Sequence, residues 1–226
     1  MYKQIAKKNF KKHLSSEISD KNLKKYFDSC FEDLFSELGL YPCWICVNCM
    51  SNDELTYGWG KSKQPQKCPK CGKSSVFAVG TFQARAPKSG EMFEVAFEHL
   101  IKKVSDLPIT KTPSANLHDF KITDKIKIEA EGSAGSVTNP DGSTSRLKRP
   151  GLKRSDTEKK AFSNAEEYKS HKSSHKFFIV TNAIPSKLTA EGRAADGLFD
   201  VTKKKDLDSF IEKCIEFKEN TLNEVL

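Results

Sequence analysis

Long hydrophobic runs are missing from this sequence. No apolar stretch approaches the roughly 18 residues that a membrane-spanning helix requires. The N-terminal segment, residues 1–8, lacks the apolar region of a secretory signal, and no internal repeat is visible along the chain. We therefore expect a protein of the cytoplasm with no membrane partner and no repeat architecture.

The chain is long enough for one ordinary domain and a small second one. It has 226 residues, of which 37% are hydrophobic and 30% are charged, a balance typical of a well-solvated globular protein with a real core. Its formal net charge of +8 is compatible with a polyanionic partner, although many basic proteins have none. Seven cysteines in a chain without a secretory signal favour metal binding over disulfides.

Four of these cysteines form two Cys-x-x-Cys pairs. Cys46 and Cys49 make the first pair, and Cys68 and Cys71 make the second. Each pair places two sulfurs on one side of a tight turn, and Gly72 lets the chain leave the second turn with a positive φ. Four thiolates suit a closed tetrahedral site for structural Zn²⁺. The pattern resembles a zinc ribbon, which is a common accessory in nucleic-acid binding.

The other three cysteines are expected to be buried thiols. Cys43 and Cys46 have the spacing of an alternative pair, but Cys46 with Cys49 makes the two pairs alike. Cys30 and Cys214 lie on the apolar faces of predicted helices, so we interpret them as core residues. None of the three has an obvious neighbouring histidine or carboxylate, which disfavours a cysteine nucleophile.

Changes in residue pattern divide the chain into three segments. Residues 1–40 are predicted to be helical, because apolar residues recur at helical spacing. Residues 41–80 hold the expected zinc ribbon. Residues 81–226 alternate helical and strand patterns, which predicts an α/β domain. Its expected elements are a helix at 91–104, strands at 119–122 and 125–131, a loop at 132–155, a helix at 157–170, strands at 177–181 and 198–201, and a final helix beginning near Leu207.

The strand at 125–131 brings carboxylates onto one face. Residues alternate between the two faces of a strand. The apolar face holds Ile126, Ile128 and Ala130, whereas the other holds Lys127, Glu129 and Glu131. With Asp119 from the neighbouring strand, these residues offer oxygen ligands for Mg²⁺. The alternative is an exposed strand face whose charges are balanced by nearby lysines.

At this point the sequence resembles the PD-(D/E)xK nucleases. The motif Asp119 … Glu129-Ala130-Glu131-Gly132 looks like an Asp that opens one strand and a (D/E)xK that ends the next. The preceding Gly90-Glu91-Met92-Phe93-Glu94 resembles the helix that comes before this motif. The resemblance implies a restriction-endonuclease-like mixed sheet flanked by helices, with N-terminal helices and a small four-cysteine zinc ribbon added. It also implies a type II or modification-dependent endonuclease acting on double-stranded DNA, with a homodimer as one option.

The resemblance also implies residue roles. Asp119 and Glu129 would hold Mg²⁺ together with the backbone carbonyl of Ala130. Glu131 would act as a base or orient water, and Glu94, or Glu98 one turn later, would be an outer acidic residue that reaches the metal through water. A loop with five cations and no anion would contact phosphates or bases. These cations are Arg146, Lys148, Arg149, Lys153 and Arg154.

One departure from the motif leaves the function open. Glu131 stands where the family has lysine, and a glutamate cannot stabilise a developing anion. The site could be an E-x-E nuclease, an inactive site, or one whose lysine comes from position 127, 153, 159 or 160. The first hypothesis is a Mg²⁺-dependent DNA endonuclease. The alternative is a non-catalytic nucleic-acid-binding protein with a degenerate nuclease fold, and a zinc-ribbon adaptor between proteins is a third option.

Overall fold

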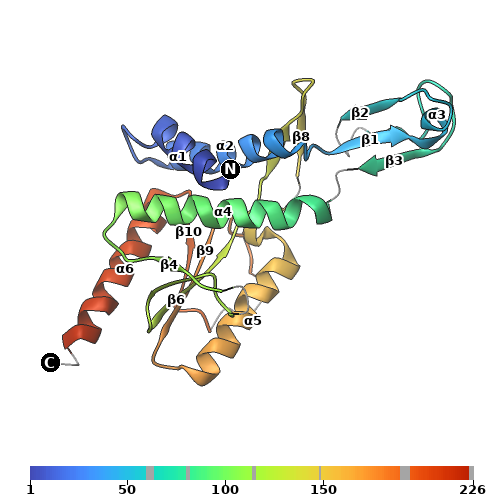
Figure 1. The fold of residues 1–226 in the computed structure, drawn as a ribbon. Coiled ribbons are helices and arrows are strands. Elements are labelled where there is room, and N and C mark those ends of the chain that lie inside the picture. Colours follow the sequence, from blue (N-terminus) through green and yellow to red (C-terminus); the bar gives the residue numbers. More distant parts are fainter. Residues whose placement is uncertain (60–63, 80–81, 114–115, 148, 189–193, 224–226) are drawn as a thin grey trace.

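The body of the protein is built around a five-stranded mixed sheet (Figure 1). The computed structural model describes residues 1–59, 64–79, 82–113, 116–147, 149–188 and 194–223. The sheet order is β10-β9-β6-β5-β4. The strand bounds are β4 Thr110–Lys111, β5 Phe120–Thr123, β6 Ile126–Glu131, β9 Lys176–Thr181 and β10 Gly197–Asp200.

The sheet changes from antiparallel to parallel at its centre. Strands β4, β5 and β6 pair antiparallel, whereas β9 is parallel to both β6 and β10. The parallel step from β6 to β9 crosses through helix α5 (Ser155–His171), because parallel neighbours need a long connection. The predicted mixed sheet flanked by helices is therefore confirmed.

Both faces of the sheet are covered. In β9, Phe178 and Val180 belong to the larger hydrophobic core, and Phe177 and Ile179 belong to a second core. Helices α4 (Phe82–Val104) and α6 (Lys204–Asn223) pack on the first face, and α5 packs on the second. A strand buried on both faces has the continuous apolar sequence that predicted β9.

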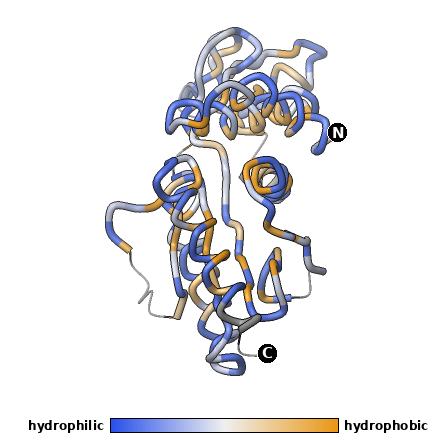
Figure 2. Tube along the Cα trace, turned by 90° about the vertical axis from the view of Figure 1, so that its left-hand side faces the viewer, coloured by the Kyte–Doolittle hydropathy of each residue, from blue (hydrophilic) through white to orange (hydrophobic). Residues whose placement is uncertain are grey.

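Two N-terminal helices share the larger core with α4. Helices α1 (Tyr2–His13) and α2 (Asp20–Leu38) pack against each other and against α4. The Tyr26 hydroxyl of α2 donates a hydrogen bond to the carbonyl of Ala96 at 2.9 Å. Figure 2 looks along α4, which lies between these two helices and the sheet. Within the described ranges, no helix combines the length and apolarity needed to cross a bilayer.

A small antiparallel sheet projects from one side of the body (Figure 1). Its strand order is β2-β1-β3, and we call this unit the ribbon. Its elements are β1 Cys43–Cys46, α3 Val47–Met50, β2 Tyr57–Trp59 and β3 Val76–Val79. The chain enters it from α2 and leaves it for α4.

Two local predictions differ from the structure. The predicted loop at 132–155 contains a hairpin of β7 (Ser136–Thr138) and β8 (Thr144–Arg146), followed by the short 3-10 helix η2 (Gly151–Lys153). Short polar strands give little alternation to detect. Helix α4 begins at Phe82 rather than at residue 91, although Pro87 lies inside it. Its added turns reach the candidate site described next.

Candidate functional site

The four predicted cysteine ligands converge at the tip of the ribbon. Their sulfur atoms all lie within 4.8 Å of one another. The Sγ atoms of Cys46 and Cys71 are 3.6 Å apart, and those of Cys49 and Cys68 are 3.7 Å apart. A tetrahedral zinc site with Zn–S bonds of about 2.3 Å has S···S edges of about 3.8 Å. The cluster could therefore hold a metal such as zinc.

The turns of the two pairs also match the prediction. The sulfur of Cys46 accepts a hydrogen bond from the backbone N–H of Cys49 at 3.5 Å. Gly72 has a φ of 70°, and its N–H bonds to the carbonyl of Cys68 at 2.9 Å. Cys43 lies three residues before Cys46 in β1, so the two side chains face opposite sides of the ribbon sheet. Cys43 is therefore outside the cluster, and it is only half-buried, so the prediction of a buried thiol at this position is wrong.

The remaining two cysteines are core residues. Cys30 and Cys214 are 1% and 0% exposed and belong to the larger hydrophobic core. Burial raises the pKa of both thiols well above the usual range. A buried, protonated thiol is a poor nucleophile and a poor metal ligand.

One face of the ribbon sheet is apolar and exposed. Tyr57 and Phe77 lie opposite Ile45 on the two strands that flank β1. Tyr57 is 51% exposed and Phe77 is 56% exposed. The other face holds Trp44, which is 7% exposed and lies across Gly58. The ribbon thus presents two aromatic rings to solvent while a third fills its small core.

The motif carboxylates meet where β5 begins and β6 ends. Asp119 directly precedes β5, and its carboxylate accepts a hydrogen bond from the backbone N–H of Ala130 at 2.8 Å. Glu129 is only 2% exposed and accepts a hydrogen bond from the side chain of Asn164 on α5 at 3.0 Å. The predicted carboxylate face of β6 is therefore covered by α5 at Glu129, whereas Glu131 keeps 18% of its side chain exposed.

Lys160 of α5 bridges the two glutamates. Its Nζ lies 3.3 Å from Oε1 of Glu129 and 2.8 Å from Oε1 of Glu131. Burial alone would lower the pKa of Lys160, but the two carboxylates raise it above its usual value. Lys160 is one of the four lysines considered from the sequence, and it places an ammonium group at the motif from another element.

Burial and mutual repulsion raise the pKa values of the carboxylates. Burial, and then the charge of Asp119, raise the pKa of Glu129 to about 8, although Lys160 opposes this shift. Burial raises the pKa of Asp119, and the N–H of Ala130 opposes it. Burial and Asp119 also raise the pKa of Glu94 on α4, which forms an ion pair with Lys111 at 2.8 Å. The site therefore favours any added positive charge.

No tight carboxylate cage is present in the part of the chain that the structure describes. There, the four cysteines are the only group of three or more His, Cys, Asp or Glu residues with ligand atoms within 4.8 Å of one another. The charges of Asp119 and Glu131 are close enough to raise the pKa of Glu129, but the three carboxylates do not form a group with ligand atoms within 4.8 Å of one another.

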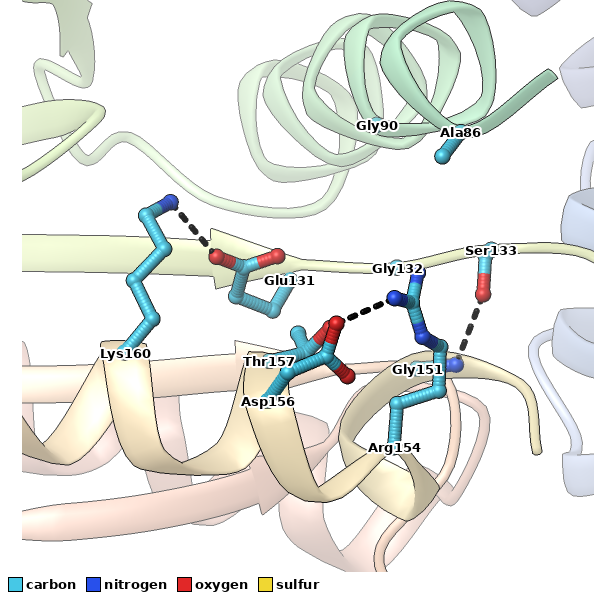
Figure 3. A pocket seen from close by; sticks show the side chains of 10 residues that line it. All are labelled: Ala86, Gly90, Glu131, Gly132, Ser133, Gly151, Arg154, Asp156, Thr157 and Lys160. Atoms are coloured by element: carbon cyan, nitrogen blue, oxygen red, sulfur yellow. Dashed lines mark hydrogen bonds and ion pairs between the residues drawn. The ribbon is translucent and has the colours of Figure 1, made fainter. Parts of the chain in front are cut away.

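A cavity of about 220 Å³ adjoins this cluster (Figure 3). Glu131 and Lys160 lie at one end of it, and Arg154 and Asp156 form an ion pair in it. The backbone of α5 begins at this cavity, with Arg154 at the N-cap position and no side-chain cap. Its lining is completed by Ala86, Gly90, Gly132, Ser133, Gly151 and Thr157.

The predicted basic loop is spread over several places. Arg154 lines the cavity of Figure 3, whereas Arg149 lines a smaller neighbouring cavity. Lys153 ends η2, and Arg146 ends β8 with an exposed side chain. Lys148 lies outside the described residues. Sequence reasoning missed Asn164, which contacts Glu129, and Arg85, which lines the smaller cavity, because a single polar residue in a helix carries no pattern.

Comparisons with known proteins identify no relative of this chain. The chain matches no protein-family model, no curated protein and no solved structure.

Proposed function

We propose that this chain is a metal-dependent DNA endonuclease, most similar to type II or modification-dependent restriction enzymes. The observation that carries the proposal is the cluster of Asp119, Glu129 and Glu131 with the ammonium group of Lys160. The order on which the resemblance rests recurs as α4, β5, β6, α5 and β9. The ribbon and the net charge of +8 support a nucleic-acid substrate.

The chemistry of the site fits Mg²⁺. Asp119, Glu129 and the carbonyl of Ala130 would hold it, because Mg²⁺ typically takes one or two carboxylates and completes its shell with water and phosphate oxygens. The pKa of Glu129 is raised because its carboxylate is buried beside other carboxylates, and a divalent cation would offset their negative charge. Bound there, the metal would supply Lewis-acid stabilisation of the phosphoryl oxygens.

Three further residues would have separate roles in the reaction. Lys160 would stabilise negative charge that develops on the phosphate, the role that Glu131 cannot perform. Glu131 would accept a proton from the attacking water or orient it. Arg154 and the first turn of α5 would hold the phosphate within the cavity of Figure 3.

The same ion pairs support a second candidate function. Lys160 contacts both glutamates, so the ammonium group already offsets part of their charge without a metal. A site balanced in this way is also what a degenerate nuclease fold would have. The second candidate is therefore a protein that binds nucleic acid and does not cleave it.

A plasmid cleavage assay separates the two. Methylated and unmethylated plasmids are incubated at low salt with Mg²⁺, with Mn²⁺ or with no divalent ion, without a chelator that would remove zinc. We expect metal-dependent fragments that Glu129→Gln and Lys160→Met each reduce by about 100-fold or more, with DNA binding retained in gel shifts. Glu212→Gln, a change of an exposed glutamate on α6, is the matched control.

The outcomes point in different directions. Cleavage by the wild type that Glu129→Gln leaves unchanged would refute the assigned site. An intact plasmid in every lane together with a gel shift would favour the non-catalytic candidate.

A further inference from the structure

Arg85 on α4 is a buried charge without a complete set of partners. The residue is 8% exposed, and its Nη1 atom is buried with no hydrogen-bond partner. A buried guanidinium nitrogen left unpaired is costly, because the group has given up its hydration. Burial accordingly lowers the pKa of Arg85. The Nη1 group of Arg85 is therefore a donor that a ligand from outside the chain could satisfy.

A small cavity lies at this donor. Its volume is about 30 Å³, and Arg85 and Arg149 both line it. A cavity of this size admits an atom group of the size of one water or one oxygen. The remaining lining residues are Phe35, Ala86, Ser89, Ser133, Ala134 and Leu147.

The small cavity is adjacent to the cavity of Figure 3. Ala86 and Ser133 line both of them. Ser133 is held in place on both sides, because its Oγ accepts the N–H of Gly151 at 2.9 Å and its backbone bonds twice to the side chain of Asn182. Ser133, anchored by these three hydrogen bonds, is therefore shared by the carboxylate site and the arginine site.

The second arginine adopts an uncommon backbone conformation. Arg149 has a φ of 66°, a left-handed value that residues other than glycine rarely adopt. Such strain persists only where the surrounding structure imposes it, and it is common at ligand-binding positions. Here it accompanies a second guanidinium group at the cavity of Arg85.

We propose that Arg85 and Arg149 form an anion site for a backbone phosphate of a nucleic-acid strand, beside the carboxylate site. One phosphate oxygen would enter the small cavity and accept from Nη1 of Arg85, and Arg149 would contact the phosphate from the surface. Guanidinium groups suit this ligand because they bind phosphate oxygens with directed hydrogen bonds. The inference relies on the proposed function only for the source of the phosphate, and it does not require cleavage.

The variant Arg85→Met distinguishes an anion site from a structural arginine. Methionine keeps an unbranched, space-filling side chain and removes the unpaired charge. If Arg85 serves a ligand, the variant should melt at the same temperature as the wild type or higher when no anion is present. If Arg85 instead stabilises the fold, the variant should have a lower melting temperature than the wild type. Lys103→Met, an exposed charge removal at the other end of α4, is the matched control.

Two probes are used with the full chain and without added divalent ions. Thermal melting is followed with inorganic phosphate against chloride at equal ionic strength, and the dissociation constant is measured for a short fluorescent oligodeoxynucleotide. We expect phosphate to raise the melting temperature of the wild type and Lys103→Met by more than that of Arg85→Met, in which the cavity of Arg154 could still hold a phosphate. We also expect Arg85→Met to weaken oligonucleotide binding at least about tenfold.

Three results would overturn the proposal. The first is a phosphate shift that is as large in Arg85→Met as in the wild type. The second is a variant that melts lower without anion. The third is oligonucleotide affinity unchanged in Arg85→Met while its phosphate response is lost, which would assign the site to a free phosphate compound. Arg85-dependent binding in a protein that never cleaves DNA would keep this inference and remove the nuclease proposal.

Discussion

Removal of zinc should unfold the ribbon and leave the body intact. The buried core of the ribbon consists of three of the four cluster cysteines with Trp44 and Val76. Burying those two side chains contributes roughly 5 kcal/mol or less. A structural zinc contributes about 10–16 kcal/mol in comparable small units. A zinc ion held by the four cysteines would therefore be the largest stabilising contribution in the ribbon.

The position of the tryptophans makes this measurable. The chain has two tryptophans, Trp44 and Trp59, and both lie in the ribbon. Tryptophan emission therefore reports the ribbon alone, whereas far-ultraviolet circular dichroism is dominated by the long helices of the body. With a zinc chelator that does not absorb in the near ultraviolet, we expect emission to shift to the red while the helical signal changes little.

Cysteine variants provide the control. Cys49→Ser should bind less zinc by elemental analysis and should show the red-shifted emission without chelator. Cys43→Ser should retain both zinc and the wild-type emission, because Cys43 lies on the other face of β1. Emission that stays unchanged after measured loss of the metal would refute the reasoning. So would a zinc content that depends on Cys43.

Two further predictions concern the body of the protein. Gly132→Ala would place a Cβ 2.1 Å from the ring of the fully buried Phe93. We therefore expect the free energy of unfolding, measured in urea, to fall by about 1–3 kcal/mol. A variant as stable as the wild type would show that α4 can shift to make room. Burial would raise the pKa of Asp196, but the N–H of Phe177 and the ammonium group of Lys176 together lower it. Ionised Asp196 therefore stabilises the fold. Asp196→Asn should cost about 1–3 kcal/mol at neutral pH, and the difference should shrink once the pH falls below about 4 and should be lost as the pH passes through the lowered pKa of the folded state. A difference that stays constant over this acidic range would contradict the assignment.

Features that depend on a few neighbouring residues were predicted from the sequence. The cysteine spacing predicted which four sulfurs converge, because a Cys-x-x-Cys turn is fixed within a few residues. Alternation in β6 predicted which side chains share a face. It could not predict that α5 covers this face, since the approach of Lys160 and Asn164 depends on the crossover between two parallel strands.

The start of α4 shows a different limit. Pro87 and Gly90 both disfavour a helix, so the pattern predicted a beginning after them. Packing of the first turns decided otherwise, because Arg85 and Ser89 are buried against the body. The residues that line the two cavities from α4 were therefore absent from the predicted site.

The placement of the ribbon makes it exchangeable. It begins where α2 ends and finishes where α4 begins, and these two helices pack against each other in one core. The ends of the insertion therefore lie on one side of a body that does not need it for its own packing (Figure 1). The cost of closing a loop grows only slowly with its length, so a short linker or a different module could join the same two helices. Replacing the ribbon by another small unit should therefore leave the geometry of the carboxylate site unchanged.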